Sequence, residues 1–74
     1  MLKPEEILIS DPGILGGERV FAGTRVPVRN LLDYLAGGHT LSEFLEEFPS
    51  VSPEQAQAAL DLAREALVAG AGPH

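Results

Sequence analysis

The chain has 74 residues, a formal net charge of −6 and no cysteine, which limits it to one domain, residues 1–74, without disulfides or zinc thiolates. No segment approaches the roughly 20 apolar residues of a membrane span, and Lys3 is followed by Pro4 and two glutamates instead of the apolar run of a signal peptide. We therefore expect a cytoplasmic protein without membrane contact. The core of so short a chain should supply no more than about 3–5 kcal/mol of stability. We expect regular helices and self-association to add to it.

Residues 1–25 form a β-rich arm in this interpretation. Ile7 to Ser10 predicts a short strand that stops at Asp11 to Gly13, where Asp and Pro suit the first two turn positions and Gly a positive φ in the third. Arg19 to Phe21 predicts a second strand, closed by Ala22 to Thr24. The two strands can pair as an irregular hairpin, but such a pair is marginal alone and must pack on helices or on another chain.

Residues 26–70 predict a three-helix unit. In the first helix, over 27–36, apolar residues recur at positions i, i+3, i+4 and i+7 of one face, and Gly37 suits its C-terminal cap. These residues are Val28, Leu31, Leu32 and Leu35.

The other two helices each begin with a capping box, in which the N-cap side chain and the side chain three residues later bond each other's backbone N–H. Thr40 and Glu43 start the second helix, over 40–48; Ser52 and Gln55 start the third, over 52–69, which Gly70 ends. The two connections have the length found in helix-turn-helix units. The fold class is therefore mainly α, with a short tail at 71–74.

The third helix is apolar over more than one face, which indicates a helix that is buried or that a partner covers. We expect a homodimer that uses the N-terminal strands, this helix, or both. The residues assigned to a dimer or partner surface are Ala58, Leu62, Ala66 and Ala69.

Charge divides the chain into two unlike halves. Residues 1–32 carry four basic and four acidic side chains, whereas residues 33–74 carry one basic and seven acidic ones. The third helix has no lysine or arginine in its first turns, so it suits phosphate or guanine contacts poorly. Positive charge is concentrated at Arg19, Arg25 and Arg29. This pattern is compatible with three roles for these arginines: they bind nucleic acid, they enter an acidic pocket of a partner, or they pair within the chain with Glu18 or Asp33.

The sequence shows no pattern of catalysis, so we expect a protein that is not an enzyme and that uses no metal and no cofactor. His39 is the one internal histidine, too few for a metal site of usual spacing, and no Ser or Thr has a base beside it. The glycines at 13, 16, 17 and 23 are not followed by the Gly-Lys-Ser/Thr of a phosphate loop.

Four segments carry a resemblance to a known family: Ile9–Gly17, Val20–Val28, Leu32–Gly38 and Phe48–Gln55. In this combination, which includes Gly-Thr-Arg-Val-Pro-Val, the chain resembles the domain of unknown function 433 family. The resemblance implies a compact helix-turn-helix domain of the homeodomain-like type with a short β element in front. It further implies an antitoxin of a type II toxin–antitoxin pair, encoded beside a PIN-like ribonuclease toxin.

Our leading hypothesis is an antitoxin-like binding module that neutralises its ribonuclease by occluding it. The acidic, metal-holding pocket that PIN-like ribonucleases share attracts a guanidinium, and Arg25 stands between a glycine turn and the residue before Pro27, where its backbone is stiff and its side chain can project. The alternative is a dimeric helix-turn-helix transcriptional regulator that binds DNA, including its own operator.

Overall fold

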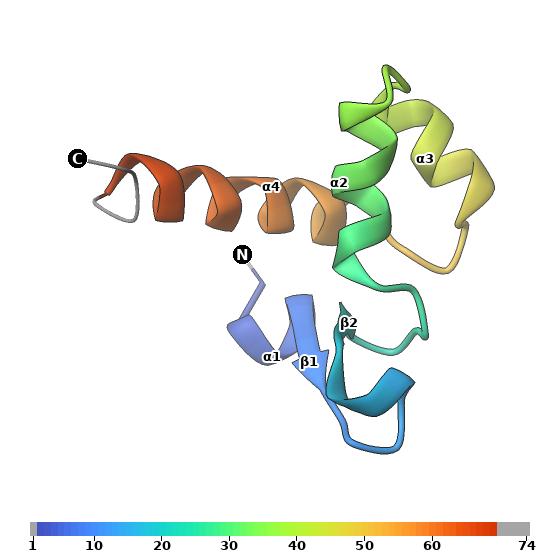
Figure 1. Ribbon diagram of the computed structural model, residues 1–74, viewed down its shortest axis with the longest axis vertical. Coiled ribbons are helices and arrows are strands. Elements are labelled where there is room, and N and C mark those ends of the chain that lie inside the picture. The colour runs from blue at the N-terminus through green and yellow to red at the C-terminus, as the bar shows by residue number, and fades with distance from the viewer. Residues whose placement is uncertain (1, 70–74) are drawn as a thin grey trace.

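A short sheet near the N-terminus and three helices that follow residue 27 make up most of the fold. The computed structural model describes residues 2–69, in the order α1 (Pro4–Ile7), β1 (Leu8–Ser10), a 3-10 turn (Leu15–Gly17), β2 (Arg19–Phe21), α2 (Val28–Ala36), α3 (Leu41–Glu47) and α4 (Pro53–Val68) (Figure 1). This described part of the protein is thus mainly helical, with four helices and one two-stranded sheet. Gly70 and the tail at 71–74 lie outside the described residues. None of the helices within residues 2–69 has the length and apolarity to cross a bilayer.

The irregular hairpin of the arm is confirmed. β1 and β2 pair antiparallel, with Leu8 opposite Phe21 and Ser10 opposite Arg19. The expected positive φ at Gly13 is wrong, because the Asp11 carboxylate accepts the Gly13 N–H at 2.8 Å and the Asp11 carbonyl accepts the Ile14 N–H at 2.8 Å. These bonds close the first turn without a left-handed residue. The positive φ values of this connection occur later, at Leu15, Gly16 and Gly17, with φ of 49°, 67° and 90°.

The first helix, α1, is absent from the sequence prediction, which assigned Ile7 to a strand. Pro4 occupies its start, and the Glu6 carboxylate accepts the Lys3 N–H at 2.9 Å. A helix of four residues is too short to show an apolar period, so only its proline and its glutamate mark it.

The ends of α2, α3 and α4 each lie within one residue of the predicted ranges, because those ranges included some of the cap residues. Pro27 is the N-cap of α2 and not its first residue, since it pairs with Val20 in a β-bridge at ψ 141°. Both predicted capping boxes form: Thr40 and Glu43 bond each other's N–H at 2.7 and 3.1 Å, and Ser52 and Gln55 at 3.1 and 3.0 Å. The backbone N–H of Thr40 holds the pKa of the Glu43 carboxyl below its ordinary value.

The core joins the arm to the helices. Phe44 of α3 is 0% exposed and its ring contacts Phe21 of β2, Tyr34 of α2 and Phe48, with centroid distances of 6.1, 5.6 and 4.9 Å. Every aromatic ring of Phe or Tyr in the chain belongs to this cluster. The other buried core residues are Ile7, Val20, Leu31, Val51, Ala56 and Ala59. The strands are therefore held by the helices, as their length requires.

Candidate partner-binding surfaces

The segment between β2 and α2 is a tightly hydrogen-bonded loop that carries Arg25 at its tip. The Phe21 N–H donates to the Val26 carbonyl at 3.0 Å, and the Phe21 carbonyl accepts both the N–H and the hydroxyl of Thr24, at 3.0 and 2.8 Å. The Thr24 hydroxyl in turn accepts the Val26 N–H at 3.0 Å. Gly23 has φ 79°, which a residue with a side chain rarely adopts. The backbone on both sides of Arg25 is thus fixed by the loop.

Arg25 itself is exposed. Among residues 2–69, neither the ion pairs nor the side-chain hydrogen bonds involve it. The fixed backbone and exposed guanidinium agree with the stiff, projecting arginine expected from the sequence. An unpaired guanidinium presents a planar fork of donors that matches a carboxylate or a phosphate.

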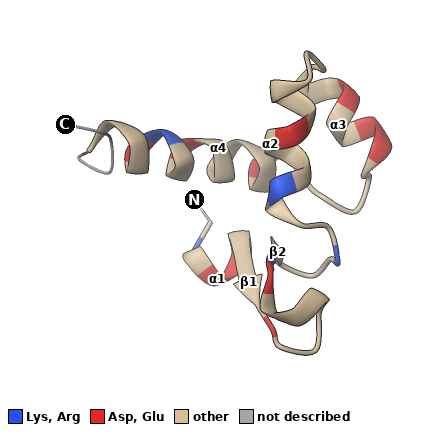
Figure 2. Ribbon diagram, viewed as in Figure 1, with Lys and Arg blue, Asp and Glu red and all other residues tan. Residues whose placement is uncertain are grey.

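The other two predicted arginines behave differently from Arg25 and from each other. Arg29, in the first turn of α2, pairs with Glu18 at 3.0 Å, as the pairing alternative allowed. Arg19 is exposed in β2, beside Glu18, and takes no part in the ion pairs of residues 2–69. Figure 2 shows basic positions near β2 and the start of α2, with others near the N-terminus and on α4, and acidic positions along α3. The structure thus leaves Arg19 and Arg25 available to a partner and holds Arg29 within the chain.

The apolar face of α4 extends beyond the part that the core covers. Ala56 and Ala59 are buried, but Leu67, which lies on the same face two turns later, is 70% exposed. The cause is visible in Figure 1, where α4 runs away from α2 and α3, and its C-terminal half stands clear of them. Of the surface predicted for a dimer or partner, Leu62, Ala66 and Ala69 are exposed and Ala58 is half-buried.

The two glutamines in the first turns of α4 are engaged within the chain. Besides closing its capping box, Gln55 donates through Nε2 to the carbonyls of Glu6 and Ala22, at 3.0 and 2.9 Å. Gln57 donates to the Asp61 carboxylate at 3.1 Å. Gln55 therefore fastens α4 to the arm, and it is not free to contact a DNA base.

Sequence reasoning missed two features of this surface. The anchoring role of Gln55 depends on carbonyls 49 and 33 residues away, and a groove over the first turns of α4 is lined by residues from three separate parts of the chain. No local pattern signals either one. The described residues contain no group of three or more His, Asp or Glu side chains placed to hold a metal ion.

Comparison with known proteins agrees with the resemblance seen in the sequence. Residues 9–63 match the model of a family described as protein of unknown function (DUF433). The uncharacterized protein y4eO of Sinorhizobium fredii (strain NBRC 101917 / NGR234) is 46% identical over 50 residues, which cover 68% of this chain and 23% of that protein. The crystal structure of a DUF433 member protein from Anabaena variabilis ATCC 29413 has a TM-score of 0.71 and 28% identity, over 81% of this chain and 59% of that chain.

The matches cover only part of each of these two relatives. The chain spans about a quarter of the length of the Sinorhizobium relative and about three fifths of the Anabaena chain. The family match ends at residue 63, so the most exposed turns of α4, with Leu67 and Val68, lie beyond it.

Proposed function

This chain belongs to the DUF433 family, whose description leaves its function open, and we propose from its own surfaces that it is a non-catalytic binding module. Its role in this proposal is that of an antitoxin which neutralises a PIN-like ribonuclease in the cytoplasm by occluding its active site. The observation that supports it best is Arg25, whose backbone is fixed by the 21–26 loop while its side chain is exposed and without an ion-pair partner among residues 2–69.

The chemistry of a ribonuclease pocket complements this loop. A cluster of carboxylates that holds a divalent metal is strongly negative, and a guanidinium that enters it can pair with a carboxylate through two parallel hydrogen bonds. Since the loop already holds the Arg25 backbone, ordering the loop adds little to the entropy lost on binding. Truncation of such a buried arginine leaves carboxylates of the partner unpaired, so Arg25 should be a hot spot.

We expect Arg25→Ala to weaken inhibition of the ribonuclease encoded beside this protein by about 30-fold, or roughly 2 kcal/mol. The thermal midpoint should stay unchanged, because within residues 2–69 the Arg25 side chain has no ion pair or hydrogen bond to lose. Cleavage of a fluorescent RNA, titrated with antitoxin, measures inhibition, and circular dichroism measures the midpoint. Arg25→Lys should restore part of the affinity, since lysine keeps the charge and loses the fork.

Arg64→Ala is the matched control, because Arg64 is exposed on α4 and makes no ion pair within residues 2–69. It should inhibit as the unaltered protein does. Loss of stability in Arg25→Ala would instead make Arg25 a structural residue. If both stability and inhibition survive, Arg25 is not the contact and the interface lies elsewhere, with the uncovered face of α4 as the next candidate.

We also propose that the protein forms a homodimer through the C-terminal half of α4. Leu62→Ser combined with Leu67→Ser should shift sedimentation equilibrium toward monomer at micromolar concentration, because it removes apolar surface that the core leaves exposed. Leu32→Ser on α2 is the control, since Leu32 and Leu62 are both 44% exposed. A stable monomer of the unaltered protein at micromolar concentration contradicts this proposal.

A dimeric helix-turn-helix DNA-binding regulator, with α2 to α4 arranged as in homeodomain-like proteins, is the second candidate. It is favoured by the exposed Arg19 and Arg25, and disfavoured by α4, whose Gln55 is engaged and whose Glu54 and Asp61 repel phosphate. If the protein binds its operator, we expect weak, steeply salt-dependent binding that alanine at Arg19, Arg25 and Arg29 abolishes in a gel shift. Operator binding that survives this triple substitution would show that the contacts lie elsewhere.

A further inference from the structure

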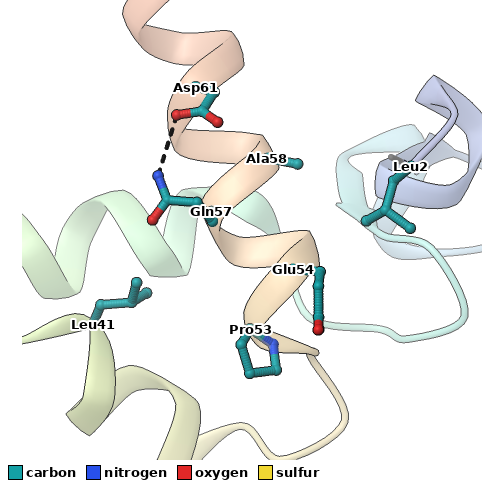
Figure 3. Close-up of a pocket in the computed structure, with 7 residues that line it drawn as sticks. All are labelled: Leu2, Leu41, Pro53, Glu54, Gln57, Ala58 and Asp61. Carbon is teal, nitrogen blue, oxygen red and sulfur yellow. Dashed lines mark hydrogen bonds between the residues drawn. The ribbon is translucent and has the colours of Figure 1, made fainter.

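A shallow groove of about 590 Å³ crosses the first turns of α4. Figure 3 shows Leu2 and Leu41 on opposite sides of this helix, with Ala58 between them and turned toward Leu2. These three apolar side chains are half-buried and pack against the core cluster from its outer side. The remaining lining residues, all exposed, are Pro53, Glu54, Gln57 and Asp61.

The groove combines apolar walls with an acidic rim. Glu54 and Asp61 are seven residues apart on α4, so their positions lie about 10 Å apart along the helix axis and on the same side of it. The surrounding half of the chain, residues 33–74, has one basic and seven acidic side chains. An occupant must therefore supply apolar side chains for the walls and positive charge for both ends of the rim.

No helix of this chain among residues 2–69 fits, because none carries more than one Lys or Arg. The exposed apolar side chains at the end of α4, Leu62 and Leu67, lie near Arg64 but also near Asp61 and Glu65, so this surface is acidic in balance. A second copy that docked through the end of α4 would therefore bring negative charge to a negative rim. The charge and the apolar walls point instead to a different protein.

We propose that this groove docks a basic amphipathic helix of a partner protein, with apolar side chains against Leu2, Leu41 and Ala58 and with two Lys or Arg residues, spaced by seven positions, beside Glu54 and Asp61. In this mode of docking, an amphipathic helix places its apolar face in a hydrophobic groove. The groove shares no lining residue with the Arg25 loop, so it is a second contact surface that does not depend on the proposed role of Arg25.

The test uses a fluorescein-labelled 14-residue peptide of leucine and lysine with one apolar face, and a second peptide in which glutamate replaces every lysine. Anisotropy titration of the full chain should show saturable binding of the lysine peptide and none of the glutamate peptide. Glu54→Gln with Asp61→Asn should weaken binding about tenfold. Glu46→Gln with Glu47→Gln on α3 changes the net charge equally, since both acids are exposed outside the groove, and should weaken it less than twofold.

Ala58→Gln, which extends a polar side chain into the groove, should also weaken binding about tenfold. Circular dichroism confirms that each variant is folded, and the rim variant keeps the test valid if Ala58→Gln is not. Equal weakening by the rim pair and the α3 pair would mean attraction to net charge alone and would overturn the proposal. So would full binding by both the rim variant and a folded Ala58→Gln, or self-association of the unaltered chain that Ala58→Gln abolishes.

Discussion

Phe44→Ala is expected to unfold the domain at room temperature. Phe44 is fully buried, and its ring contacts Phe21, Tyr34 and Phe48, so this one side chain connects β2, α2 and the end of α3. Truncation of a buried phenylalanine costs about 3–5 kcal/mol through lost burial and the cavity left behind. The whole core of a chain of this length supplies about the same free energy. No margin of stability therefore remains.

Urea denaturation followed by circular dichroism at 222 nm measures this effect. The alanine variant should lose most of its helical signal without urea, whereas Phe44→Leu keeps most of the volume and should cost less than about 1.5 kcal/mol. Leu32→Ala, at a side chain that is 44% exposed, is the control and should remain folded. A cooperative transition of Phe44→Ala within 1 kcal/mol of the unaltered protein would show that the aromatic cluster does not hold the core together.

The helices could be predicted from sequence because their signals are local. The apolar period of residues 28–35 and the capping boxes at Thr40 and Ser52 each lie within a few residues, and the structure confirms all three helices to within a residue. The arm was predicted less well. α1 has no apolar period, and the turn predicted at Asp11 to Gly13 forms without the positive φ expected at Gly13, because the Asp11 side chain accepts the Gly13 N–H. An aspartate can close a turn with its own side chain, so the pattern of residues 11–13 is compatible with either sign of φ at Gly13.

For the candidate surfaces too, the features that depend on neighbouring residues could be predicted, and those that depend on tertiary structure could not. The exposure of Arg25 could be predicted from its neighbours, since Gly23 and Pro27 restrict the loop on both sides. The fate of Arg29 remained open between a partner and Glu18, because the hairpin that brings Glu18 within 3.0 Å is tertiary structure. The end of α4 was predicted as a dimer or partner surface at Ala58, Leu62, Ala66 and Ala69, without Leu67, which is 70% exposed. Which of them the core covers depends on the direction of α4 relative to α2 and α3, which no sequence period encodes.

Gln55→Glu is expected to destabilise the protein by about 2–3 kcal/mol at pH 7, although it preserves the capping box. The side-chain oxygen that accepts the Ser52 N–H at 3.1 Å is present in both residues. What is lost is the amide nitrogen, which donates to the carbonyls of Glu6 and Ala22 at 3.0 and 2.9 Å. A carboxylate there would face two carbonyl oxygens without a proton to offer, and leaving the carbonyl of the half-buried Ala22 unpaired costs on the order of 1 kcal/mol or more.

The cost should depend on pH in a direction that identifies its cause. Facing two carbonyls raises the pKa of the introduced carboxyl in the folded state above its unfolded value, so the protonated form is favoured by folding. The stability deficit is therefore full above the folded-state pKa and shrinks as the pH falls toward 4, where the acid can again donate one bond. Urea denaturation at pH 7 and pH 4, each referred to the unaltered protein at the same pH, measures the change. Gln57→Glu is the control, since Gln57 is exposed on the same helix and bonds only Asp61, and it should cost no more than about 0.5 kcal/mol. If the two variants are equally stable at pH 7, the Gln55 amide does not fasten α4 to the arm, and the apolar contacts of Ile7, Ala56 and Ala59 alone must hold the two parts together.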